Sequence, residues 1–113
     1  MPQAQATQTD RLFDALADPT RRRVVEQLGV APQRPGELAA ATGTSASTMS
    51  RHLRALLEAG VVVDERPSND ARARVFRLRP ESVTAAQGWL DQIKANWDEQ
   101  LGSFQRHVER TRR

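Results

Sequence analysis

Apolar residues recur at intervals of three and four along the last third of the chain. This stripe consists of Ala86, Leu90, Ile93, Trp97, Leu101, Phe104 and Val108. The spacing predicts one long amphipathic helix from Pro80 to about Arg110, with its apolar face close to a heptad period. A chain of 113 residues does not easily cover so much apolar surface by itself. We therefore expect a second copy to pack against the stripe.

Shorter apolar stripes predict four helices before the long one, at residues 10–17, 19–28, 35–41 and 46–59. Asp18 followed by Pro19 is typical of a helix start, because the carboxylate accepts free amide groups and proline fits the first helical position. Gly29 is expected to end the second helix, and Ser45 is expected to cap the fourth. Gly43 lies in the short connection between the third and fourth helices, which predicts a helix-turn-helix.

Two short strands are predicted after these helices, at residues 61–66 and 75–78, around the polar turn 67–70. A hairpin directly after a helix-turn-helix is typical of a wing. The expected fold is therefore mainly α with a small β-hairpin: a winged helix-turn-helix with a long C-terminal dimerisation helix. We expect a flexible tail at 1–9, a single DNA-binding and dimerisation domain at 10–110, and a basic tail at 111–113.

The fourth predicted helix has an apolar face and a face of small hydroxyls and basic side chains. Small hydroxyls let the start of a helix approach the floor of the major groove, and arginine can bind guanine through two hydrogen bonds. The candidate DNA contacts are Ser45, Ser47, Thr48, Arg51, His52 and Arg54. Structural alternatives remain open for three of them. Ser45 is equally typical of a cap, His52 of a structural hydrogen bond, and Arg54 of a solvated or phosphate-facing side chain.

Arg72 and Arg74 are the candidate DNA contacts of the wing. Alternate residues of a strand share a face, so we expect both side chains to project toward one groove. Asp70 is expected to neutralise part of this charge. Roles for Arg66, Arg77 and Arg79 are left undecided.

Composition excludes several classes of function. The net charge is +3, and Lys94 is the single lysine among 17 basic residues, which suits phosphate recognition but is equally expected from a G+C-rich genome. The chain has no cysteine and two histidines, and its carboxylates form no paired constellation, so we expect neither an enzyme nor a cofactor. Met1–Thr9 is uncharged and no apolar run could cross a bilayer, so we expect a cytoplasmic protein without a membrane partner.

Four segments together resemble ArsR-type winged-helix repressors, over about residues 10 to 80. These are Ala-Leu-Ala-Asp-Pro-Thr-Arg-Arg (15–22), Glu-Leu-Ala (37–39), Ser-Ala-Ser-Thr-Met-Ser-Arg-His-Leu-Arg-Ala-Leu (45–56) and Glu-Ala-Gly-Val-Val (58–62). The resemblance implies a homodimer built on the first and last helices, with two recognition helices reading an inverted repeat in double-stranded DNA. For matching positions it implies DNA contacts by Ser47, Thr48, Arg51 and His52. Repression is implied by the resemblance alone.

The sequence departs from the metal-sensing relatives. The third helix carries Glu-Leu-Ala-Ala-Ala where thiolate sensors have cysteines. On the last helix Asp91 and His107 are sixteen residues apart, about 24 Å along the helix axis. We therefore expect no metal site and place the chain with the metal-free members, with an effector that is unknown. The alternative interpretation is a winged-helix protein-interaction module without DNA binding.

Overall fold

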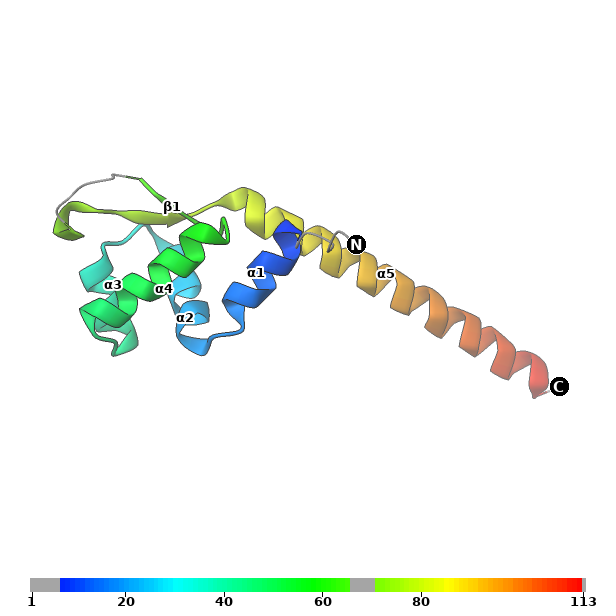
Figure 1. Ribbon diagram of the computed structural model, residues 1–113. Helices are drawn as coiled ribbons and strands as arrows, with labels where there is room; N and C mark the ends of the chain where they lie inside the picture. Colours follow the sequence, from blue (N-terminus) through cyan, green and yellow to red (C-terminus); the bar gives the residue numbers. More distant parts are fainter. Residues whose placement is uncertain (1–6, 66–70, 113) are drawn as a thin grey trace, which may run out of the picture.

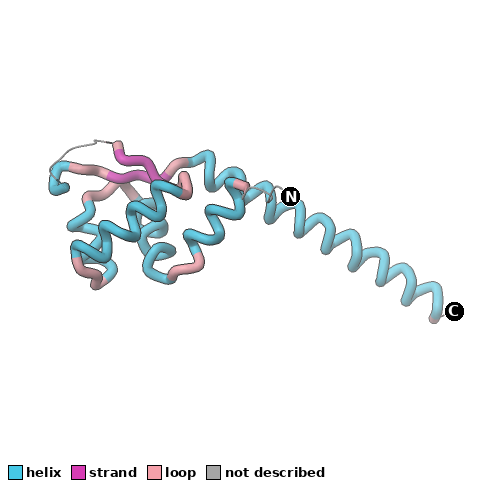
Figure 2. Tube along the Cα trace, viewed as in Figure 1, coloured by secondary structure: helices cyan, strands magenta, loops and turns pink. Residues whose placement is uncertain are grey.

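The computed structural model describes residues 7–65 and 71–112. The elements in order are α1 (Gln8–Leu16), α2 (Pro19–Val30), α3 (Pro35–Thr42), α4 (Ala46–Glu58), β1 (Val62–Asp64), the 3-10 helix η1 (Ala71–Ala73), β2 (Phe76–Leu78) and α5 (Pro80–Thr111). The first four helices and the hairpin form a head, and α5 starts beside α1 and projects away from it (Figure 1). The expected winged helix-turn-helix with a long last helix is confirmed (Figure 2).

The head is held together by one apolar core to which each of its four helices and the hairpin contribute. Its largest fully buried side chains include Phe76, Leu38, Met49, Leu56 and Val24. Apolar side chains of this size each contribute about 1.5–3 kcal/mol when they leave water. The packing of α3 and α4 around this core fixes the direction of α4 relative to the hairpin.

The second helix begins as the sequence predicts but ends later. Asp18 Oδ1 accepts hydrogen bonds from the amides of Thr20 at 2.8 Å and Arg21 at 3.1 Å. The expected end at Gly29 is wrong, because α2 continues to Val30 and the chain leaves the helix at Ala31, which is extended. Ala31 precedes a proline, and the proline ring disfavours helical backbone at the residue before it.

The turn between α3 and α4 needs glycine. Gly43 has φ +65° and ψ +34°, the left-handed conformation that a side chain disfavours, and it ends α3. Ser45 then caps α4, its Oγ accepting from the amide of Thr48 at 3.2 Å. Gly60, at φ +75°, turns the chain from α4 toward β1. The turn at Gly43 agrees with the sequence-based prediction.

The hairpin is shorter than expected. β1 and β2 are antiparallel with Val62 opposite Leu78 and Asp64 opposite Phe76. The backbone of Phe76 also exchanges two hydrogen bonds with that of Gln33, at 2.9 and 3.0 Å, on the edge of β2 away from β1. The expected turn at 67–70 and the side chains of Arg66 and Asp70 lie outside the described residues.

Both terminal boundaries differ from the expected tails. Thr7 caps α1, which starts at Gln8, so the predicted tail at 1–9 is too long; residues 1–6 lie outside the described part. The last helix runs through Thr111, inside the expected basic tail.

Phe13 of α1 and Trp89 of α5 meet edge to face, with ring centroids 5.1 Å apart, where α5 leaves the head.

Most of the apolar stripe of α5 is uncovered in the single chain. Trp97 is 60% exposed and Phe104 is 64% exposed. Val83, Leu90, Ile93 and Leu101 are also exposed. With 32 residues, α5 is about 48 Å long, so its far half lies beyond the reach of its own head (Figure 1).

The start of α2 gives a prediction about stability and pH. The hydrogen bond from the Arg21 amide is the main cause that lowers the pKa of Asp18, against the opposing effect of burial. Replacing Asp18→Ala should lower the free energy of unfolding by about 1 kcal/mol at pH 7, as measured by urea denaturation. Because the folded pKa is the lower one, this contribution is present above the unfolded value of about 3.9 and disappears as pH falls through the folded value. The difference between D18A and the parent should therefore shrink in acid, and a difference that stays constant down to pH 3 would contradict this account.

Candidate nucleic-acid interface

The start of α4 carries a cluster of hydroxyl groups. Ser45 Oγ donates to Thr48 Oγ1 at 3.0 Å and lies 3.3 Å from Ser47 Oγ. Arg51 Nη2 is 3.5 Å from the same Thr48 oxygen. The structure thus brings four of the predicted residues together on one surface, where the amide end of a helix favours anions such as phosphate.

The basic side chains of α4 fall into two environments. Arg51 and Arg54 are exposed, three residues apart on the helix surface. His52 is half-buried and close enough to Asp18 to contribute to the lowered pKa of that carboxyl, after the larger effect of the Arg21 amide. His52 therefore lies near the start of α2, and its structural and its DNA-contact interpretations both stay predictions.

The wing arginines do not lie as the strand argument predicted. Arg72 belongs to η1 and is exposed, whereas Arg74 follows η1 and precedes β2. Neither residue lies on a strand, so the alternation of strand side chains from which we expected a shared face does not apply to them. Arg77 Nε on β2 lies 3.8 Å from Glu65 Oε1. Arg79 is exposed just before α5.

Arg74 is engaged in a contact that the sequence analysis missed. Its Nε and Nη2 both lie 2.7 Å from Oδ2 of Asp64, and its guanidinium stands 4.9 Å from the centre of the Phe76 ring. Its side chain is 31% exposed and that of Asp64 14% exposed. The partner of Arg74 is thus Asp64 on β1, and the expectation that Asp70 neutralises part of the wing charge lies outside the described residues. Pairing of the two predicted strands places Asp64 opposite Phe76, and Phe76 lies two residues after Arg74 in the chain. This pairing is the signal from which the contact could have been predicted.

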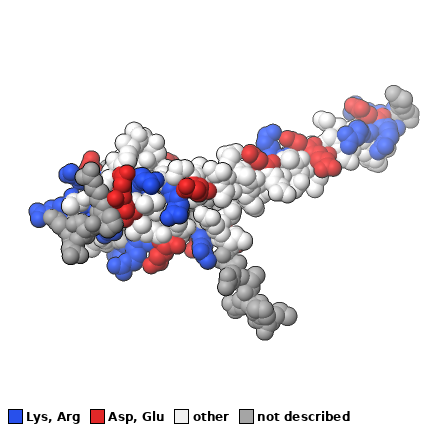
Figure 3. Space-filling view, turned by 90° about the horizontal axis from the view of Figure 1, so that it is seen from above, with Lys and Arg blue, Asp and Glu red and all other residues white. Residues whose placement is uncertain are grey.

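Charge is unevenly distributed over the molecule. Basic side chains lie around the hairpin end of the head and at the far end of α5, with acidic ones among them (Figure 3). Within residues 7–65 and 71–112, no three His, Cys, Asp or Glu side chains come together as metal ligands would. The same residues contain no helix that is long and apolar enough to span a membrane.

Known proteins resemble this chain over most of its length. Residues 16–65 match the family described as a helix-turn-helix domain. The HTH-type transcriptional regulator Rv2034 of Mycobacterium tuberculosis is 40% identical over 84 residues, which cover 74% of this chain and 76% of that protein. An ArsR-like transcriptional regulator from Rhodococcus sp. RHA1 superposes with a TM-score of 0.71 at 27% identity, covering 86% of this chain and 89% of that one.

A solution structure from Mycobacterium bovis shares the fold. It is described as the homodimeric winged helix-turn-helix DNA-binding domain of Mb0332, a possible ArsR-family regulator. The TM-score is 0.60 at 24% identity, covering 85% of this chain and 91% of that one. At this identity the likeness concerns the fold alone.

The contact between Asp64 and Arg74 predicts how firmly the wing is held. Asp64→Asn keeps the shape of the side chain but removes its charge. The Glu65 amide, which donates to the Val75 carbonyl at 2.8 Å, should exchange its hydrogen about two- to fivefold faster, with a global stability loss of at most about 1 kcal/mol. Hydrogen exchange followed by NMR measures this, and Glu65→Gln, which affects only the longer contact to Arg77, is the control. Equal protection in D64N and the parent would mean that the ion pair does not hold the wing.

Proposed function

The chain belongs to the ArsR-like family of winged helix-turn-helix transcriptional regulators, and we propose that it is a homodimeric repressor that reads an inverted repeat in double-stranded DNA through α4. The family consists of DNA-binding regulators and not of enzymes. The proposal that α4 reads the DNA sequence rests on the hydroxyl and arginine surface at the start of this helix. In this motif, that part of the second helix enters the major groove.

Within α4, the side chains divide between base and backbone contacts. Ser47, Thr48 and Arg51 are the base-facing group, because they lie together at the helix start and Arg51 has the planar donor pair that guanine accepts. Ser45 acts mainly as the cap that orients this group. His52 and Arg54 would contact the phosphate backbone at the edges of the groove.

The wing would add contacts that do not depend on sequence. Arg72 is exposed on η1, which packs against α3 of the helix-turn-helix. Arginines on a wing contact phosphates or enter the minor groove, where the potential is negative. Arg74 would contribute in a different way, because its pairing with Asp64 ties the η1 segment to β1 and thereby sets where Arg72 lies.

Dimerisation would use α1 and α5. The uncovered stripe of α5 continues from the place where Phe13 packs on Trp89, so one surface runs from the head onto the long helix. Burying an aromatic side chain there contributes about 1.5–3 kcal/mol. A twofold axis through this surface would present two copies of α4 to two half-sites of a palindromic operator.

Arg51→Ala tests the reading helix. With an operator selected from pooled genomic fragments, this change should weaken specific binding by about 1–3 kcal/mol and relax the preference at one base pair. Fluorescence anisotropy with the operator and with single-base variants measures both effects. Arg110→Ala, at the far end of α5, removes the same charge away from the head and should leave the preference intact. An R51A protein with unchanged affinity and preference would exclude Arg51 from base recognition.

Trp97→Glu tests the dimer surface. A charge in the middle of the apolar stripe should shift the monomer–dimer equilibrium toward monomer by at least about tenfold, which sedimentation equilibrium measures. Operator affinity should fall with it, because one copy of α4 reads only one half-site. Asn96→Glu places the same charge on the neighbouring residue, outside the stripe, and should remain dimeric. A dimeric W97E protein with normal affinity would contradict the proposed use of α5.

A further inference from the structure

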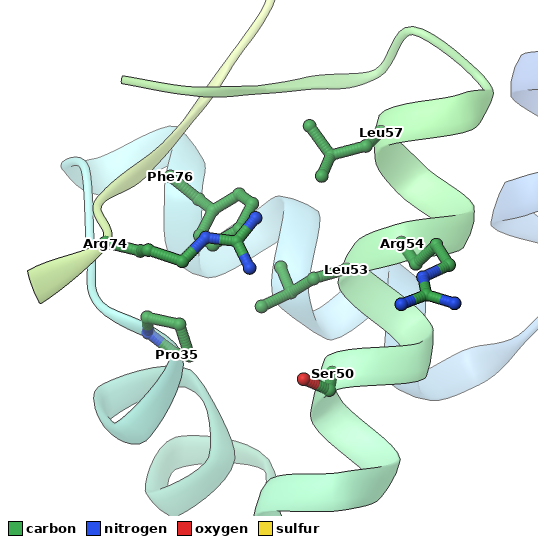
Figure 4. Close-up of a pocket in the computed structure, with 7 residues that line it drawn as sticks. All are labelled: Pro35, Ser50, Leu53, Arg54, Leu57, Arg74 and Phe76. Atoms are coloured by element: carbon green, nitrogen blue, oxygen red, sulfur yellow. The ribbon is translucent and has the colours of Figure 1, made fainter. Parts of the chain in front are cut away.

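A cavity of about 140 Å³ lies between α4, the start of α3 and the segment from η1 to β2 (Figure 4). Its apolar walls are Leu53 and Leu57 of α4, Pro35 of α3 and Phe76 of β2. Its polar groups are Ser50, Arg54 and Arg74. The cavity is therefore an apolar hollow with hydrogen-bond donors at its edge, a composition common to small-molecule sites.

The volume sets the size of an occupant. An apolar protein cavity of about 150 Å³ accommodates one benzene ring. The hollow beside α4 therefore has room for a single six-membered ring or a branched alkyl group of similar size. The half-buried Leu57 and Pro35 offer such a group a contact surface, whereas Leu53 and Phe76 are almost fully buried.

The charges set the chemistry of an occupant. Asp64 already pairs with Arg74, so this arginine brings little net charge. Arg54 has no hydrogen bond or ion pair within the described part of the chain and retains its full charge at the edge of the cavity. Ser50 Oγ points into the cavity, and the guanidinium of Arg74 points across it toward Leu53 (Figure 4). One uncompensated cation beside an apolar wall favours a monoanion with an apolar body.

We propose that this cavity is an effector site for a small carboxylate with one ring or a compact alkyl group, benzoate being the simplest example. The ring packs on Leu57 and Pro35, and the carboxylate accepts from Arg54 and Ser50. Binding opposes DNA, because it engages Arg54 and places a negative charge between α4 and the wing, where the phosphate backbone would pass. This second part rests on the DNA-binding role proposed above. By thermodynamic linkage, bound DNA weakens the binding of the carboxylate by the same factor.

Binding is tested first without DNA. NMR titration with benzoate should move the amide signals of Ser50, Arg54 and Leu57. Benzyl alcohol lacks the charge of benzoate, and acetate lacks its ring. At equal ionic strength, each should bind at least about fivefold more weakly than benzoate. A titration with inorganic phosphate tests whether the site binds any anion. No response to benzoate would overturn the proposal, and so would an equal response to phosphate, which would indicate a seat for any anion.

Coupling to DNA is tested with two variants of similar size. Ser50→Leu fills the cavity from an exposed position outside the proposed DNA contacts, whereas Ala41→Leu adds the same bulk on the exposed surface of α3 away from the cavity. Saturating benzoate should weaken operator binding by about fivefold in the parent and in A41L but not in S50L. Benzoate that binds without changing operator affinity would overturn the regulatory part. Failure to bind DNA in the absence of benzoate would instead refute the proposed function, and the NMR titration would still stand.

Discussion

Phe76 is the residue on which the geometry of the proposed DNA-facing surface depends. Its ring is buried in the core of the head, while its backbone pairs with Gln33 on one edge and lies opposite Asp64 on the other. Arg74 rests on the same ring and reaches the same Asp64. A hairpin of three-residue strands is too short to be stable alone, so this anchoring is what gives the wing a fixed position relative to α4.

The start of α4 combines two requirements that compete elsewhere in proteins. A helix start needs a side-chain acceptor, and a groove-reading surface needs free hydroxyls and donors. Ser45 meets the first requirement, and the hydrogen bonds among Ser45, Thr48 and Arg51 hold the remaining groups in one arrangement before any ligand arrives. Groups that are already ordered lose less conformational entropy on binding. The same contacts would thus serve both folding and the proposed recognition of DNA.

Much of this architecture could be predicted from the sequence because its signals are local. The Asp18-Pro19 start, the left-handed Gly43 and the period of α5 each depend on neighbours a few residues away. The failures involve distant partners. The link between Arg74 and Asp64 and the cavity beside Arg54 arise only when α3, α4 and β2 meet, and no periodicity encodes them. The end of α2 is the one local exception, because the signal of Gly29 competes there with that of the proline that follows Ala31.

The projecting half of α5 has a further consequence. Most of the stability of a helix in a protein comes from the tertiary packing of its amphipathic face. In the proposed dimer, the exposed Trp97 and Phe104 would give it such contacts with the second copy. Order in this segment would then be governed by mass action, so the fraction of chain in the fully helical form would rise with its own concentration. Occupancy of a two-half-site operator would rise more steeply than the amount of protein, which makes the cellular abundance of the chain itself a control variable.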